Sequence, residues 1–119
     1  MRADAQKLQK QSSYGTIYID DVTDAIIKVI DKKDIHGIFN LGSGKSIELR
    51  KIIHTVRNLI NPNLHINYGA VPYREDQIMH LESNIDKITN EIEWRPSVEM
   101  DKGLIKTVDW LKSNIHRES

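Results

Sequence analysis

The sequence of 119 residues contains no cysteine, a single phenylalanine, three prolines and no excess of either charge. Without cysteine the chain forms no disulfide and performs no thiol chemistry, which fits a reducing compartment. Lysine plus arginine and aspartate plus glutamate number 17 each, so net charge indicates neither nucleic acid nor an anionic membrane as a partner. No apolar run is long enough to span a bilayer, and the first residues lack the apolar core of a secretion signal. We therefore expect a cytoplasmic protein.

The five histidines show no metal-ligand spacing, and there is no cysteine to complete a zinc site. The sequence therefore predicts no metal centre. Hydrophobic residues make up 39% and charged residues 29% of the chain, an ordinary balance for one globular domain.

Apolar residues recur at helical spacing in three segments, which predicts helices over residues 22–30, 49–60 and 100–115. Asp20 and Asp21 precede the first of them, and we expect their carboxylates to cap its free amide groups. Strands are predicted at 17–19, 38–41 and 64–68, and a short helix near 85–92 with Asn84 or Asp86 as its cap. Trp94 and Trp110 are expected to be core or packing residues. The alternation of strands and helices predicts an α/β fold.

Gly42-Ser43-Gly44-Lys45-Ser46 follows a predicted strand and precedes a predicted helix, as a phosphate-binding loop does. The complete pattern requires a glycine five residues before Gly44, where the chain has Phe39. We therefore expect a structural turn formed by Asn40, Gly42 and Gly44, in which glycine supplies unusual backbone angles.

Arg74 is the candidate ligand-binding residue. Its guanidinium can donate two hydrogen bonds to one phosphate, and it lies in a predicted loop, where binding residues concentrate. The alternative is an exposed arginine paired with Glu75 or Asp76.

Six motifs resemble, in order and spacing, the C-terminal part of NAD-dependent epimerases/dehydratases, which are extended short-chain dehydrogenases/reductases acting on nucleotide sugars. They are Ile17 to Val22, Phe39 to Gly44, Pro72 to Met79, Asn84 to Lys87, Ile92 to Pro96 and Met100 to Thr107. No single motif is specific to this family, but the occurrence of all six motifs in this order and spacing is.

The resemblance implies the C-terminal strands and helices of a Rossmann-type enzyme, on its substrate-binding side, over residues 14–119, after a polar N-terminal arm at 1–13. It implies a nucleoside diphosphate sugar as the ligand, bound by Arg74, Tyr73 and Tyr18. The family's second arginine, which helps hold the substrate diphosphate, would fall at Tyr14. The implied setting is polysaccharide biosynthesis, with isomerase or lyase chemistry, and the Pro72-Tyr73-Arg74 variant with Met79 leans towards deoxysugars.

Two family features are absent from this chain. There is no Gly-x-x-Gly-x-x-Gly turn to hold the pyrophosphate of a dinucleotide, and no tyrosine is followed four residues later by lysine. NAD or NADP is thus implied for a complete relative, and we expect this chain alone to bind no cofactor, to carry no catalytic residue and to reduce no NAD. A truncated or split product, a non-catalytic remnant that pairs with a separate Rossmann half, a homo-oligomer and a free-standing binding module all remain open.

Overall fold

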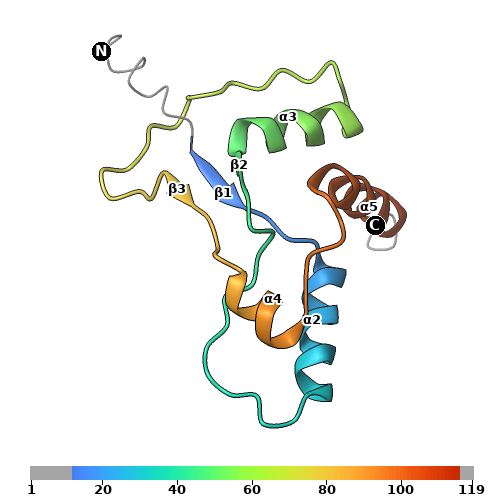
Figure 1. The fold of residues 1–119 in the computed structure, drawn as a ribbon. Helices are drawn as coiled ribbons and strands as arrows, with labels where there is room; N and C mark the ends of the chain where they lie inside the picture. The colour runs from blue at the N-terminus through green and yellow to red at the C-terminus, as the bar shows by residue number, and fades with distance from the viewer. Residues whose placement is uncertain (1–11, 116–119) are drawn as a thin grey trace.

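The computed structural model describes residues 12–115 and confirms the α/β class. Most of the predicted N-terminal arm, residues 1–11, lies outside the described residues. The elements are β1 (Ser13–Gly15), α2 (Ile19–Asp31), β2 (Ser46–Glu48), α3 (Leu49–Ile60), β3 (His80–Leu81), α4 (Asp86–Ile92) and α5 (Met100–Asn114). Figure 1 shows the sheet with α3 and α5 in one half of the molecule, and α2 with α4 in the other. None of the helices within residues 12–115 is both long and apolar enough to cross a membrane.

The three strands form one sheet in the order β2-β1-β3. The central strand β1 pairs antiparallel with β2 and parallel with β3, which places Tyr14 opposite both Ile47 and Leu81. Side chains at paired positions point to the same face of a sheet, so these three residues share one face.

The predicted strands at 17–19, 38–41 and 64–68 were wrong, and the strands lie elsewhere. A strand requires a hydrogen-bonded neighbour, and among residues 12–115 no neighbouring strand lies beside these segments. Residues 38–41 are extended, but their polar backbone contacts are made by side chains. Lys87 Nζ donates to the Ile38 carbonyl at 2.8 Å, and Ser83 Oγ donates to the Leu41 carbonyl at 3.4 Å.

The predicted helices are confirmed as α2, α3 and α5, with α4 as the short helix. Helix α3 ends at Ile60, and its C-terminal cap residue is Asn61. The Asn61 side chain accepts a hydrogen bond from the Asn63 amide, as expected if Asn61-Pro62-Asn63 forms the turn that ends the helix. Helices α3 and α5 pack against each other, and Lys112 Nζ donates to the Leu59 carbonyl at 3.1 Å. The cap residue of α4 is Ile85, so the prediction of Asn84 or Asp86 as the cap was wrong, although the Asn84 side chain accepts from the Asp86 amide at 2.9 Å.

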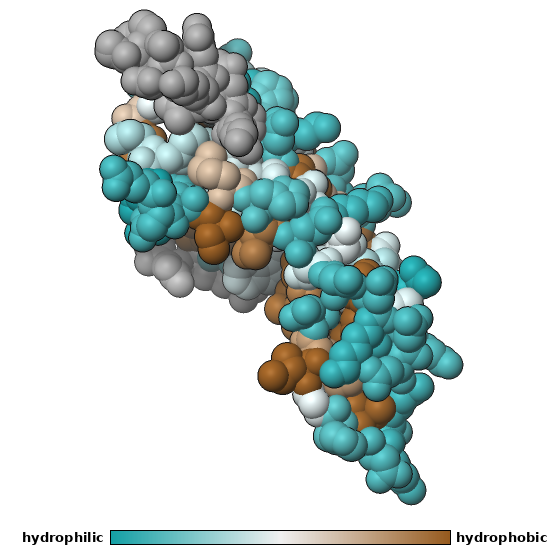
Figure 2. All heavy atoms as spheres, turned by 60° about the vertical axis from the view of Figure 1, so that its left-hand side comes forward, coloured by the Kyte–Doolittle hydropathy of each residue, from teal (hydrophilic) through white to brown (hydrophobic). Residues whose placement is uncertain are grey.

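The core is small and lies between α2 and α4. Its centre is the buried cluster Ala25, Ile88, Ile92 and Trp94, and half-buried apolar side chains pack around it. Trp94 is fully buried, as predicted, whereas Trp110 is 63% exposed, so its prediction as a core residue was wrong. Helical periodicity places Trp110 on α5 but does not say which face of α5 meets a neighbour. On the face of the molecule that Figure 2 shows, brown, apolar surface lies between teal, hydrophilic patches in both halves.

Candidate functional site

Arg74 lies in a turn between α3 and β3 that is closed by its own hydrogen bonds. The Gln77 amide donates to the Arg74 carbonyl at 3.2 Å, and the Arg74 amide donates to Gln77 Oε1 at 3.4 Å. The Arg74 side chain is 79% exposed, and its Nε lies 3.8 Å from the Asp76 carboxylate. Such an exposed pair contributes little stability, so the guanidinium can exchange Asp76 for a ligand. Its two Nη groups have no hydrogen-bond partner among residues 12–115.

Tyr14 and Gln77 contact this turn, and sequence reasoning did not include them in the site. The Tyr14 hydroxyl donates to the Ile78 carbonyl at 2.7 Å and accepts from Gln77 Nε2 at 3.3 Å. Tyr14 stands where the family resemblance expects an arginine, and that departure was the only sequence signal. In this structure the Tyr14 side chain makes hydrogen bonds to Ile78 and Gln77 of the same chain.

Tyr18 lies in a different place, in a cleft of about 570 Å³ between residues 16–18 and the start of α5. Its ring packs against Gly103, where a Cβ would lie 3.2 Å from Tyr18 Cδ1, and Lys106 Nζ lies 5.4 Å from the ring centroid. Arg74 and Tyr73 do not line this cleft. The structure therefore does not bring the three predicted binding residues together in one pocket.

Asp21 joins the start of α2 to the segment before α5. Its Oδ1 accepts from the amide and the hydroxyl of Ser97 at 3.0 and 2.9 Å, and its Oδ2 accepts from the Val98 amide at 3.0 Å. Burial raises the pKa of Asp21, but the hydrogen bonds from Val98 and Ser97 and the charge of Lys106 together outweigh burial, so its pKa lies below the ordinary value.

The expectation that Asp20 and Asp21 cap their own helix was wrong. The cap residue of α2 is Tyr18, without a side-chain cap bond, and both aspartates lie inside the first turn. Asp21 instead uses both carboxylate oxygens on a segment 76 residues further along the chain. Its role is structural.

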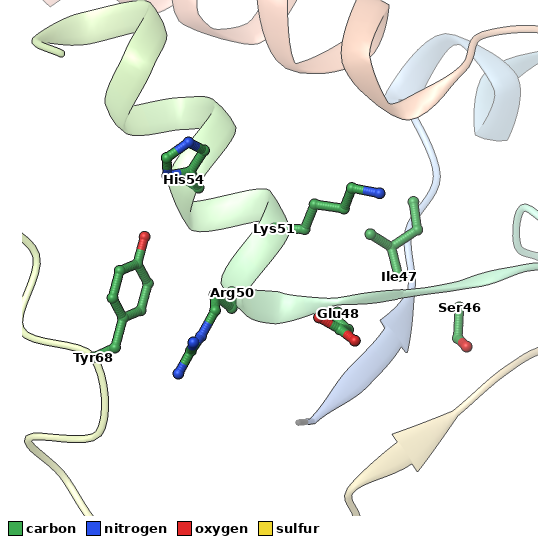
Figure 3. Close-up of a pocket in the computed structure, with 7 residues that line it drawn as sticks. All are labelled: Ser46, Ile47, Glu48, Arg50, Lys51, His54 and Tyr68. Atoms are coloured by element: carbon green, nitrogen blue, oxygen red, sulfur yellow. The ribbon is translucent and has the colours of Figure 1, made fainter. Parts of the chain in front are cut away.

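A second pocket, of about 560 Å³, lies beside the start of α3 (Figure 3). The Arg50 guanidinium carbon lies 4.9 Å from the Tyr68 ring centroid, and the Tyr68 hydroxyl is buried without a hydrogen-bond partner among the described residues. Arg57 Nη2 lies 3.0 Å from His54 Nδ1, and because arginine only donates, Nδ1 is the acceptor in this contact. Figure 3 shows Lys51 extending away from Tyr68, towards Ile47. The pocket is lined by the basic side chains of Arg50, Lys51 and His54 and by one carboxylate, Glu48, which makes no ion pair with them among the described residues.

The Gly42–Ser46 segment is a structural turn and has no phosphate-loop geometry. Gly44 has a φ of +78°, as expected of a glycine turn, but the next element is strand β2, and the element before the turn is helix α2. A phosphate loop needs a helix N-terminus at this point. The Asn40 side chain has no hydrogen bond among residues 12–115, so its predicted part in the turn is not found.

A serine–histidine contact joins the strands: Ser13 Oγ lies 2.8 Å from His80 Nδ1. The Glu82 carboxylate accepts from the Ser46 amide at 2.9 Å, and among residues 12–115 it makes no hydrogen bond to His80. The contact is exposed and serves to hold the sheet together. Within the described part of the chain no three histidine, aspartate or glutamate residues are grouped as metal ligands.

No family model matches the chain. The CDP-abequose synthase of Salmonella muenchen is 35% identical over 92 residues, which cover 76% of this chain and 31% of that protein. The dTDP-4-dehydro-6-deoxyglucose reductase of Escherichia coli is 32% identical over 103 residues, which cover 82% of this chain and 30% of that protein.

Among solved structures, the epimerase Mth375 of Methanothermobacter thermautotrophicus matches with a TM-score of 0.82 and 23% identity, over 92% of this chain and 33% of that one. At this identity the match shows the fold, that of a Rossmann-type extended short-chain dehydrogenase/reductase. Other matched structures are complexes with NAD, with NADPH or with UDP-sugars.

The relatives and structural neighbours of this chain are thus NAD-dependent nucleotide-sugar epimerases and dehydratases of the extended short-chain dehydrogenase/reductase family, which confirms the recognition made from the sequence. The chain spans about a third of the length of the curated relatives that it matches, as a C-terminal part of such an enzyme would.

Proposed function

We propose that this chain forms the nucleotide-sugar binding portion of an NAD(P)-dependent sugar-nucleotide epimerase or dehydratase, and that Arg74 holds the diphosphate of the ligand. The observation that carries the proposal is the exposed guanidinium on a closed turn, with both Nη groups free of partners among residues 12–115. Two parallel N–H donors match the oxygens of a phosphate. The relative named dTDP-4-dehydro-6-deoxyglucose reductase supports the leaning towards deoxysugars.

Tyr73 and Tyr18 remain in the proposal with different parts. Tyr73 precedes Arg74 on the same turn and is half-buried, so it can pack against the portion of the ligand next to the diphosphate. Tyr18 lines the separate cleft near α5, and we propose that this cleft receives another portion of the ligand.

The described residues do not fit a dinucleotide cofactor. The only glycine-rich turn in residues 12–115, at 42–44, leads into β2 and so presents no helix N-terminus to a pyrophosphate. We therefore assign no cofactor contact to this chain and propose that it has no redox activity by itself. In a complete relative, NAD or NADP supplies the hydride chemistry.

Replacing Arg74 by alanine should weaken binding of a nucleoside diphosphate without changing stability. Losing charge-assisted hydrogen bonds costs about 1.5–3 kcal/mol, which is roughly a ten- to hundredfold rise in Kd. Isothermal titration with CDP, dTDP and UDP measures the change, and thermal unfolding checks the fold. The matched control is Lys33→Ala, because Lys33 is also an exposed cation but lies outside the turn and lines neither of the two pockets described above. Equal Kd values for the Arg74 variant and the wild type would contradict the proposal.

The second candidate is an interaction module that pairs with a separate Rossmann half, and the uncovered apolar residues of α2 favour it. Ile26, Ile27 and Ile30 are 54, 52 and 74% exposed, and Ile38, at the start of the unpaired extended segment, is 84% exposed. A parallel sheet with a free edge strand would satisfy both features, because it offers backbone groups to residues 38–41 and an apolar face to α2.

Replacing both Ile26 and Ile30 by lysine should abolish such pairing. Each buried isoleucine contributes about 1.5–3 kcal/mol, so the double variant should weaken association more than a hundredfold. The partner is the N-terminal two-thirds of the Salmonella relative, supplied in trans, and analytical ultracentrifugation measures the association. Asp24→Lys/Lys28→Asp alters the charged face of the same helix as a control. No association with the wild-type chain would rule this candidate out.

A further inference from the structure

The stretch that carries Arg74 has few attachments to the rest of the protein. From Val71 to Met79, the hydrogen bonds that leave this stretch within residues 12–115 all reach β1. The Tyr14 hydroxyl bonds to Ile78 and Gln77, and the Ser13 amide donates to the Met79 carbonyl at 2.8 Å. The position of Arg74 in space is therefore set from β1.

The Tyr14 hydroxyl contacts the turn at two points. It donates to the Ile78 carbonyl at 2.7 Å, just beyond the turn, and accepts from Gln77 Nε2 at 3.3 Å, inside it. The other end of the same Gln77 amide, Oε1, accepts from the Arg74 backbone at 3.4 Å. A continuous path of hydrogen bonds thus runs from the phenol through Gln77 to Arg74.

The base of this path is rigid, because Tyr14 lies on the central strand of the sheet, paired on both sides. Its neighbour Ser13 is also held on both sides, by Glu48 and His80 in register. A binding group held in place before the ligand arrives loses less conformational entropy on binding, and so binds more tightly.

We propose that Tyr14 is a positioning residue for anion binding: its hydroxyl fixes the turn of residues 74–77 and thereby holds the Arg74 guanidinium ready for a diphosphate. The inference rests on the proposed function of Arg74. It also assigns a different role to the position where the family resemblance expects an arginine. Tyr14 contributes no charge to the ligand site, but its hydroxyl holds in place Arg74, which contributes a positive charge.

The test is a double-mutant cycle of Tyr14→Phe and Arg74→Ala, measured by isothermal titration with UDP and with inorganic pyrophosphate. Tyr14→Phe keeps the ring and removes both hydrogen bonds, so we expect Kd to rise about two- to tenfold, the range for ordering one flexible side chain. In the Arg74→Ala background the same change should have no effect, because there is no guanidinium left to position. Tyr68→Phe is the control, since its hydroxyl has no hydrogen bond among the described residues and it lies outside the turn of residues 74–77.

Gln77→Met is a second variant, which removes the hydrogen bonds between Tyr14 and Arg74 without changing a residue of the sheet. It should raise Kd by the same factor as Tyr14→Phe. Amide exchange at Arg74 and Gln77 should quicken in both variants, because these amides lie within the turn. Equal losses from Tyr14→Phe in both Arg74 backgrounds, or no loss while Arg74→Ala still weakens binding, would overturn the inference alone. If Arg74→Ala leaves Kd unchanged, the inference and the proposed function fail together.

Discussion

Replacing Trp94 by alanine is expected to remove about 3–5 kcal/mol from the free energy of unfolding, the range for truncating a large buried aromatic residue. Trp94 is fully buried in a core that contains few other buried side chains. Its indole also donates to the Asp21 carbonyl at 3.0 Å, and its own carbonyl accepts from Thr89 Oγ1 at 3.0 Å. A domain of this size has only about 5–15 kcal/mol of stability in total, so this variant should lie near the unfolding threshold.

Urea denaturation followed by far-UV circular dichroism measures the loss. Trp110→Ala is the matched control, because the same residue type is removed from a site that is 63% exposed. We expect the control to change the free energy of unfolding by less than about 1 kcal/mol. If the two tryptophan variants are destabilised equally, the core does not lie between α2 and α4 as described.

Replacing Asp21 by asparagine is expected to destabilise the protein by about 1.5–3 kcal/mol at neutral pH, the range for hydrogen bonds to a charged group. Asparagine can keep one acceptor oxygen, but its amide nitrogen would then face an N–H donor of Ser97 or Val98. Asp20→Asn is the matched control in the same turn of α2, because Asp20 is exposed and makes no hydrogen bond among residues 12–115.

The same variant should change how stability depends on pH. Because the pKa of Asp21 is lower in the folded state than in the unfolded chain, its contribution is fully present above the unfolded value of about 3.9. That contribution is lost as the pH falls through the lowered folded-state pKa, when the carboxylate is protonated. We therefore expect a shallower decrease in stability as the pH falls below about 4 in Asp21→Asn than in the wild type. Parallel acid-unfolding curves for the two proteins would contradict this.

The candidate site was only partly predictable from the sequence. Arg74 was proposed from its residue type and from the family resemblance, both of which are local properties of the chain. Tyr14 and Gln77 were not found, because the hydroxyl of Tyr14 meets carbonyl and amide groups 64 and 63 residues away. No spacing rule connects such positions. The separation of Tyr18 from the Arg74 turn was equally invisible, because a motif order does not say which motifs share a pocket.

The sequence by itself determined the helices, the turn at Asn61, the glycine turn at Gly44 and the family, because helical hydrogen bonds and turn chemistry are made between near neighbours. Only the tertiary structure decided which segments are strands, which tryptophan is buried and which groups Asp21 binds. Each of these depends on a partner far away in the chain. A strand exists only beside another strand, and a side chain is buried only when a second element covers it.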